Sequence, residues 1–513
     1  MDNTVTYRKP HFPIRQHYKH IITLILLLHL GTVPTLVSGQ ERFDYNAGIN
    51  EAYTAASALD FERGHQILDS IRSNDPTNLA VVHIENYIDF FTLFISEKQS
   101  DFDRLKANKE ARLMRLESAD PDDPYLPFVE AEIILQWALI RSKFDELFLS
   151  ARELYKAYNI LEDAQDDNPD FLLYNKSLSI IHALAETIPL PGFVKSVIGV
   201  SGSIEQGVTE ITALIDNLES QSTASLFTQE AQAIYAFIIL YQQNDPQAAW
   251  EYYQTSQVAN NQSPVAKFVG VKIAQRSGHN TEAIQILDTV TDTEFEQFPY
   301  LSFLKGLCLL RDLDPEAEQY FSRFLRDFEG RHYIKEAYQK IGWTVLVMDN
   351  NIPGYKTAMA ACQDQGYATI DDDKQALKDA NSDQIPHPEL LRARLLYDGG
   401  NYQRAFSSLI QQSHTLYYDE EYKAEYLYRM GRISQMLYNY PDAIGYYREI
   451  INTEQYRSTF YACNAALQVG IIFENQGDKI QAEQYFDQCL SMRPDKYQYS
   501  LHQKAKSGLN RIK

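Results

Sequence analysis

The chain has 513 residues, is 44% hydrophobic and 23% charged, and carries a formal net charge of −22. These proportions are typical of a folded soluble protein and exclude wholesale disorder. Because nucleic-acid binding depends on lysine and arginine, the acidic balance argues against a nucleic-acid-binding protein.

The first segment, residues 1–39, has the pattern of a secretory signal peptide. Basic residues precede the apolar run Ile21–Leu30, and small residues follow it up to Gly39. The run is shorter than the roughly 20 apolar residues that span a bilayer. We therefore expect cleavage after Gly39, with an uncleaved N-terminal anchor as the alternative. Export to a bacterial periplasm is the expected localisation, and extracellular space is the second choice.

From residue 40 onwards, apolar residues recur at i, i+3, i+4 and i+7, which is the spacing of amphipathic helices. Short breakers such as Asn168-Pro169 and Gly399-Gly400 separate the helical segments. A helix pair at a period of roughly 35 to 40 residues indicates a repeat protein. The predicted parts are N-terminal helical repeats (40–180), a central Pro/Gly-containing insertion (181–225), degenerate helix pairs (226–385) and a C-terminal array (386–513).

The C-terminal array shows the repeat most clearly. Counted from Gly470, Gly477 lies at offset 7, Ala482 at 12 and Phe486 at 16. A small residue in each helix lets two antiparallel helices approach closely, and the aromatic residue fills the gap to the next pair. Copies of this spacing begin at Ala52, Ala236, Ala393 and Gly431, and those around Gly270 and Gly306 are out of step by one residue.

These residues resemble the signature of the tetratricopeptide repeat. The resemblance implies an all-α fold, a superhelical solenoid of antiparallel helix pairs with a concave inner wall. The Tyr and Phe residues of the pattern are then expected to fill the core. Within this solenoid, residues 181–225 form an irregular insertion.

The insertion has a Pro-containing turn, an apolar segment and a Ser-Gly joint, carried by Pro189, Pro191, Ser201, Gly202 and Gly207. These residues resemble the central motif of the inclusion-body-clearance and tetratricopeptide-repeat-39 family, although Val200 stands where an aromatic is usual. That resemblance implies an all-helical protein without catalytic machinery and a role in protein or membrane association. Relatives of this kind are intracellular, so the predicted signal peptide is a departure. The segment is interpreted either as a buried hairpin or as a membrane-touching or partner-touching element.

Searches for chemistry find no phosphate-binding glycine loop, no G-x-S-x-G and no H-E-x-x-H. The acidic runs at 120–123 and 371–373 are expected to be solvated, so no metal or cofactor is predicted. Four cysteines occur, and buried free thiols are favoured. A disulfide between Cys463 and Cys489 is the open alternative, because the two lie on opposite helices of one predicted hairpin.

Inner-wall residues are the candidate site. Arg394 and Arg432 lie in successive repeats and are flanked by tyrosines, a combination that suits a peptide with a carboxylate and an apolar side chain. The alternative is that both arginines pair with nearby acids. The offsets −3, +1 and +4 from the small residue predict a partner-binding groove of Leu390, Arg394, Tyr397, Tyr428, Arg432, Gln435, Leu467, Ile471 and Glu474.

The sequence thus predicts an exported, non-catalytic scaffold that binds a protein or peptide partner through its concave face. A second hypothesis is a carrier or assembly factor that holds an apolar envelope component around Ile188–Ile211. An enzyme within the poorly matched residues 77–225 is the third.

Overall fold

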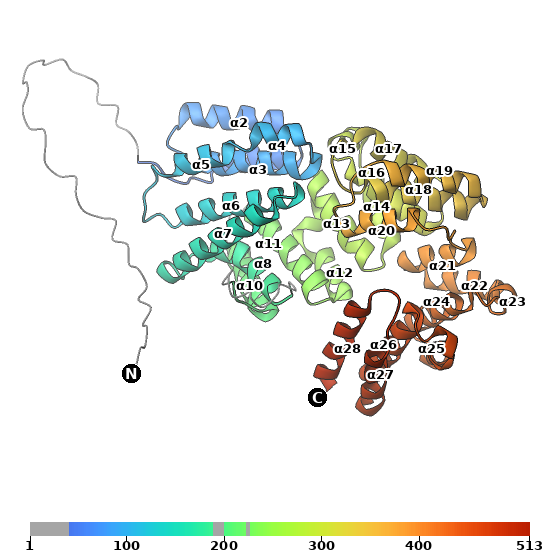
Figure 1. Cartoon of the computed structure of the whole chain (residues 1–513). Helices are drawn as coiled ribbons and strands as arrows, with labels where there is room; N and C mark the ends of the chain where they lie inside the picture. Colours follow the sequence, from blue (N-terminus) through green and yellow to red (C-terminus); the bar gives the residue numbers. More distant parts are fainter. Residues whose placement is uncertain (1–39, 188–199, 222–225, 513) are drawn as a thin grey trace, which may run out of the picture. The chain divides into compact units, whose positions relative to one another are not determined.

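The regular secondary structure of the described residues is helical (Figure 1). The computed structural model describes residues 40–187, 200–221 and 226–512. In these ranges it holds no strand, only an isolated bridge between Arg42 and Asn78. The predicted all-α class is confirmed. The predicted signal peptide and Pro189 and Pro191 lie outside the described residues.

The N-terminal helices begin at polar caps. Asn46 and Asp60 accept hydrogen bonds from the first-turn backbone of α1 and α2, which satisfies N–H groups that have no partner inside the helix. The elements of this region are α1 (Ala47–Ser57), α2 (Phe61–Asn74), α3 (Ala80–Ser96), α4 (Gln99–Leu105), α5 (Asn108–Leu116), α6 (Tyr125–Lys143), α7 (Leu147–Asp167), the short η1 (Leu172–Tyr174) and α8 (Asn175–Thr187).

The middle of the chain continues with helices that often start at proline, which is pre-organised for the first helical position. Pro246 and Pro264 open α12 and α13 in this way. The elements are α10 (Ile204–Ser220), α11 (Phe227–Phe237), η2 (Ile238–Gln242), α12 (Pro246–Thr255), η3 (Gln257–Asn260), α13 (Pro264–Arg276), α14 (Asn280–Asp288), α15 (Asp292–Gln297), α16 (Tyr300–Asp312), α17 (Ala317–Asp327), α18 (Ile334–Asp349), α19 (Ile352–Asp364) and α20 (Asp371–Ala380).

The C-terminal helices coincide with the clearest repeats of the sequence. They are α21 (Pro388–Asp398), α22 (Tyr402–Gln411), α23 (Ser413–Leu416), α24 (Lys423–Met436), α25 (Tyr440–Asn452), η4 (Glu454–Tyr456), α26 (Phe460–Asn475), α27 (Lys479–Ser491) and α28 (Gln498–Ile512). Neighbours along the chain pack as pairs, notably α21 with α22, α24 with α25 and α26 with α27. The superhelical arrangement of these pairs stays a prediction.

A left-handed residue ends the first helix of several pairs. At offset 7 from the small residue, Gly400 and Gly477 both have φ of 78°, and Tyr438 has φ of 60°. Leu59 and Leu313 occupy the same offset with φ of 63°. A left-handed residue reverses the chain after a helix, and a side chain there costs roughly 1–2 kcal/mol. The turn geometry therefore recurs even where the expected glycine is missing.

The small residue and the aromatic residue of each pair meet as the spacing predicts. A Cβ atom added to Gly470 would lie 2.6 Å from the Phe486 ring, and one added to Gly431 would lie 2.5 Å from Tyr447. Both rings are fully buried. These aromatic residues therefore fill the core, and glycine is required opposite them because any side chain would overlap the ring.

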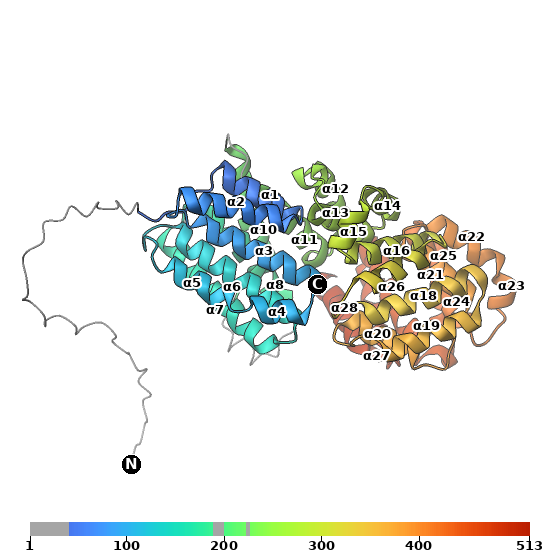
Figure 2. The same ribbon diagram turned by 90° about the horizontal axis from the view of Figure 1, so that it is seen from above.

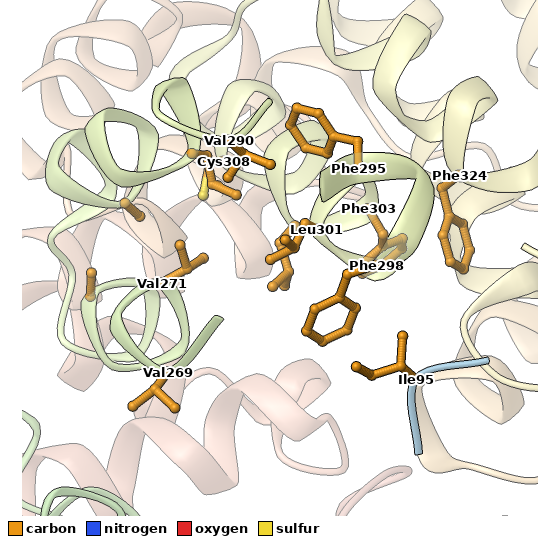
Figure 3. Packing of buried hydrophobic residues seen from close by; sticks show 14 of the residues in the cluster. Ile95, Val269, Val271, Val290, Phe295, Phe298, Leu301, Phe303, Cys308 and Phe324 are labelled. Carbon is orange, nitrogen blue, oxygen red and sulfur yellow. The ribbon is translucent and has the colours of Figure 1, made fainter. Parts of the chain in front are cut away.

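Buried apolar side chains gather in three clusters within residues 40–512. One joins α1–α3 to α11–α21, a second lies among α3–α11, and a third among α21–α28. Figure 3 shows the first cluster, where Ile95 of α3 faces Phe298 and Phe303. Helices assigned by sequence to separate repeat regions thus share one core. The third cluster begins at Leu390, near the predicted boundary at residue 386.

All four cysteines are buried and carry free thiols. The Sγ atoms of Cys463 and Cys489 are 3.6 Å apart, on α26 and α27. Burial raises the pKa of Cys308 and of Cys362 to about 11. In the structure Cys463 and Cys489 are therefore thiols and do not form the alternative disulfide. Of the helices in the described ranges, none combines the length and apolar character needed to cross a membrane.

Candidate functional site

A cavity of about 640 Å³ lies among α16, α18, α20, α21, α24 and α26, and we name it the central cavity. Contacts link α21 to α16, α18 and α24, and α24 to α26 (Figure 2). Six basic side chains and four acidic ones line it, the reverse of the whole chain with 47 basic and 69 acidic residues. Six aromatic rings line it too: Trp343, Tyr397, Tyr428, Phe460, Tyr461 and Tyr497.

Arg432 of α24 is the most unusual group in this lining. Its guanidinium donates to the Tyr397 hydroxyl at 2.6 Å and to the Tyr428 hydroxyl at 3.3 Å. The Tyr397 ring lies 5.3 Å from the guanidinium carbon. Among the described residues no carboxylate forms an ion pair with Arg432, and its Nε is buried without a hydrogen-bond acceptor.

The tyrosines beside Arg432 do not neutralise it. Burial raises the pKa of Tyr397, although the charge of Arg432 opposes that shift. The Tyr397 hydroxyl therefore stays protonated at neutral pH. The Tyr428 hydroxyl also accepts a hydrogen bond from the Asn464 amide at 2.6 Å. Since arginine keeps its charge in proteins, Arg432 is a half-buried cation held by neutral groups.

Arg394 of α21 borders the same cavity. Its guanidinium lies 5.0 Å from the Trp343 ring, and its Nε is 3.6 Å from the Asp398 carboxylate one turn further on. The Arg394 side chain is 45% exposed, so this pair is solvent-screened and weak. The alternative that both arginines pair with acids thus describes Arg394 in part and does not describe Arg432.

Two other cations of the lining are neutralised within the fold. Arg429 binds the Glu425 carboxylate on the same helix. The Lys340 ammonium lies 3.0 Å from Glu336 and 4.0 Å from the Trp343 ring. These pairs build part of the wall of the central cavity, whereas Arg432 forms no ion pair with an acid of the described residues.

The structure places some of the predicted groove residues in the lining of the central cavity and others outside it. Arg394, Tyr397, Tyr428 and Arg432 line the central cavity together. Leu390 and Leu467 do not line it, because each is 1% exposed within the third cluster. The offset rule does not take into account which positions other side chains cover.

The remaining three predicted residues also lie away from the central cavity. The Gln435 side chain accepts from the Tyr447 hydroxyl at 2.8 Å. Glu474 receives two hydrogen bonds from Arg511, at 2.6 and 2.8 Å. Ile471 packs against the third cluster.

Sequence reasoning missed the wall that α16 and α18 supply. Arg311, Lys340 and Trp343 belong to helix pairs whose repeat spacing is degenerate, so no offset predicted their orientation. The signal that was available is Trp343, since only 3 Trp occur in the chain.

A second charged cluster, the Lys176 network, lies inside the N-terminal region. The Lys176 ammonium of α8 contacts Glu132 of α6 at 2.7 Å and also binds Glu230 of α11. Tyr87 accepts a further hydrogen bond from Lys176 at 2.8 Å. Burial alone would lower the pKa of Lys176, but the two carboxylates outweigh it and raise that pKa. Here each charge has partners, so the network is a structural element.

Glu97, which follows α3, forms a similar link to a distant segment. Its carboxylate is 2.9 Å from the His332 ring, binds Lys143, and accepts backbone N–H groups of Arg331 and His332 at 3.2 and 3.1 Å. Burial would raise the pKa of Glu97, but His332 and Lys143 outweigh it and hold the pKa at about 2. The carboxylate therefore ties α3 to the start of α18.

Comparisons of the chain with models of known protein families and with curated proteins found no match. No group of three or more His, Cys, Asp and Glu side chains arranged to hold a metal ion occurs within residues 40–187, 200–221 and 226–512. The central cavity is therefore the candidate site on the strength of its own geometry.

Proposed function

We propose that this chain is a non-catalytic helical-repeat scaffold, exported from the cell, that binds a protein partner through the central cavity. The partner presents a segment with a carboxylate and an aromatic or apolar side chain. The carboxylate pairs with Arg432, and the apolar group packs among the rings of Tyr397, Tyr428 and Trp343.

The observation that carries this proposal is the Arg432 guanidinium without a carboxylate. A half-buried cation is costly unless an anion joins it, and a ligand carboxylate supplies that anion. Arginine presents a planar donor set that fits a carboxylate with two hydrogen bonds. Tyr, Trp and Arg are also the residues in which interface binding energy concentrates. Because the whole chain carries a charge of −22, it attracts an acidic segment only where basic groups gather. Such groups gather in the lining of the central cavity.

The test is selection of a phage-displayed library of random dodecapeptides on the immobilised protein. Recovered peptides are synthesised with fluorescein, and their affinity is measured by fluorescence anisotropy. We expect enrichment of peptides that combine Asp, Glu or a free C-terminus with aromatic or large apolar residues. Because loss of a hydrogen bond to a charged group costs about 1.5–3 kcal/mol, Arg432→Gln should weaken them by roughly 10- to 100-fold.

Arg448→Gln is the matched control. Arg448 is an exposed arginine on α25 that donates to the Tyr485 hydroxyl and does not line the central cavity. It removes the same charge and should leave affinity nearly unchanged. Peptides that bind wild type and Arg432→Gln equally would place binding elsewhere on the chain and contradict the proposal.

The carrier hypothesis has no comparable observation. The cavity that borders α10 holds about 290 Å³ and is lined by polar groups that include Asp216, Glu219 and Gln232. Residues 188–199 lie outside the described part of the chain. An apolar ligand near the insertion therefore stays a prediction.

A further inference from the structure

Cations that are at least partly buried usually have acidic partners in this protein. In the described ranges, four such Lys or Arg side chains form no ion pair: Lys272, Arg311, Lys335 and Arg432. Lys335 donates to the backbone carbonyls of Cys362 and Gln363 at 2.8 and 3.0 Å, so it is satisfied. The other three therefore form a distinct set.

These three cations lie on α13, α16 and α24, which are linked through the contacts of α13 with α16, α16 with α21, and α21 with α24. Arg311 and Arg432 both line the central cavity. Lys272 is on α13, which packs against α16, the helix that carries Arg311. Arg311 also abuts the turn after α21, since a Cβ atom added to Gly399 would lie 3.0 Å from the Arg311 Cβ. The Lys272 ammonium lies 6.0 Å from the centre of the Tyr300 ring.

The electrostatics around Lys272 agree with this placement. Burial lowers the pKa of Lys272, and the charges of Arg311 and Arg276 lower it further, whereas Asp372 and Glu336 oppose the shift. Glu336 is engaged by Lys340 at 3.0 Å. Asp372 is the other acid that opposes the shift in the pKa of Lys272. The surroundings of Lys272 thus hold an excess of positive charge inside an acidic protein.

We infer that Lys272 and Arg311 form a second anion-binding subsite, and that the partner is an extended acidic peptide that places one carboxylate there and another on Arg432. This inference rests on the proposed function and specifies its ligand. Two separated basic subsites select a segment by the spacing of its acids, and the rings between them accept intervening apolar side chains.

The helices that separate Arg311 from Arg432 set the distance between the two subsites. Two helix-to-helix steps, α16 to α21 and α21 to α24, separate Arg311 from Arg432. At roughly 8–10 Å per step these helices span at most about 20 Å. An extended peptide advances about 3.3 Å per residue, so the two acids are expected roughly six positions apart.

The experiment uses fluorescein-labelled dodecapeptides built on one Ser-Ala-Tyr background, with a single Glu or with two Glu residues two, four, six or eight positions apart. Anisotropy is measured for four forms of the full chain: wild type, Lys272→Gln/Arg311→Gln, Arg432→Gln, and the control Lys356→Gln/Lys378→Gln. The control removes two exposed cations of α19 and α20 that do not line the cavity.

We expect wild type to bind the peptide with six-position spacing about tenfold more tightly than the single-Glu peptide. The Lys272→Gln/Arg311→Gln variant should erase that preference while retaining single-Glu binding, and the control should keep it. Equal affinity of wild type for single- and double-Glu peptides would overturn the two-subsite inference and leave the proposed function intact. If none of the variants lost affinity for the single-Glu peptide, the role assigned to Arg432 would instead be contradicted. If an oligothymidylate bound more tightly than any peptide, the central cavity would be a nucleic-acid site. That result would overturn both the two-subsite inference and the proposed function.

Discussion

Buried charge is treated differently in the N-terminal and C-terminal regions of this molecule. In the N-terminal region, Lys176 has two carboxylates and a tyrosine around it, and Arg112 binds Asp89, the Asn86 amide oxygen and a backbone carbonyl. In the C-terminal region, Arg432 has tyrosine hydroxyls and no acid. The first arrangement is complete within the chain, whereas the second, under the proposed function, is completed by a bound anion.

This comparison shows how structural charge can be separated from charge available to a ligand in an all-helical fold. A buried ion whose partners all lie in the same chain contributes to stability or specificity of folding. A half-buried cation among aromatic rings in a cavity, without an acid, is the group that the proposed function assigns to a ligand. Variants of the two kinds should therefore differ in which property they change.

The largest effect is expected for Lys176→Met. The substitution leaves Glu132 and Glu230 buried without their cation, and breaking a buried pair in this way costs about 3–5 kcal/mol. Urea denaturation followed by circular dichroism measures this loss. Lys176→Met/Glu230→Gln removes one of the two stranded charges and should recover part of it. An unfolding midpoint unchanged in Lys176→Met would show that the Lys176 network is not structural.

A somewhat smaller effect is expected for Glu97→Gln, about 3 kcal/mol at neutral pH. The folded-state pKa of Glu97, about 2, lies below that of an unfolded glutamate, about 4.3. The stabilisation by Glu97 is therefore fully present at neutral pH and is lost as the pH falls from about 5 to about 2. Denaturation of both proteins between pH 7 and pH 3 measures it, and a difference that persists undiminished at pH 3 would refute the assigned ion pairs.

Next in size is Gly470→Ala, which tests the packing rule of the repeats. The new methyl group would overlap the Phe486 ring, and overpacking of a core costs about 1–3 kcal/mol. Gly445→Ala is the control, because Gly445 is exposed on α25 with no atom within 4 Å of its added Cβ. That change should stabilise the helix by up to about 1 kcal/mol. Thermal denaturation distinguishes the two, and equal effects of both would contradict the rule.

Local spacing made much of the fold predictable. The small residues, the residues sixteen positions later and the turns between them coincide with the pairs α21/α22, α24/α25 and α26/α27, because each pair packs through local contacts. The joining of α3 to α18 through Glu97 was not predictable, since residues 97 and 332 are linked only by the tertiary fold. For the same reason the Lys176 network, whose residues come from four separate helices, has no sequence pattern.

The candidate site was predictable in part. Successive repeats align Arg394 and Tyr397 with Tyr428 and Arg432, and the structure brings these four together. Leu390 and Leu467 were assigned to the same wall by counting, but counting does not reveal which positions neighbouring helices cover. The contributions of Arg311 and Trp343 required the structure, because α16 and α18 lie far from that array in sequence.

The most direct test of the central claim is the unfolding free energy of Arg432→Gln beside that of Arg112→Gln. Removing a cation that has no acid should change stability by less than about 1 kcal/mol, whereas Arg112→Gln strands the buried Asp89 and should cost about 3 kcal/mol or more. We predict this contrast in urea denaturation at neutral pH without any peptide. A loss in Arg432→Gln as large as that in Arg112→Gln would show that Arg432 is a structural group and would contradict its assignment to a ligand.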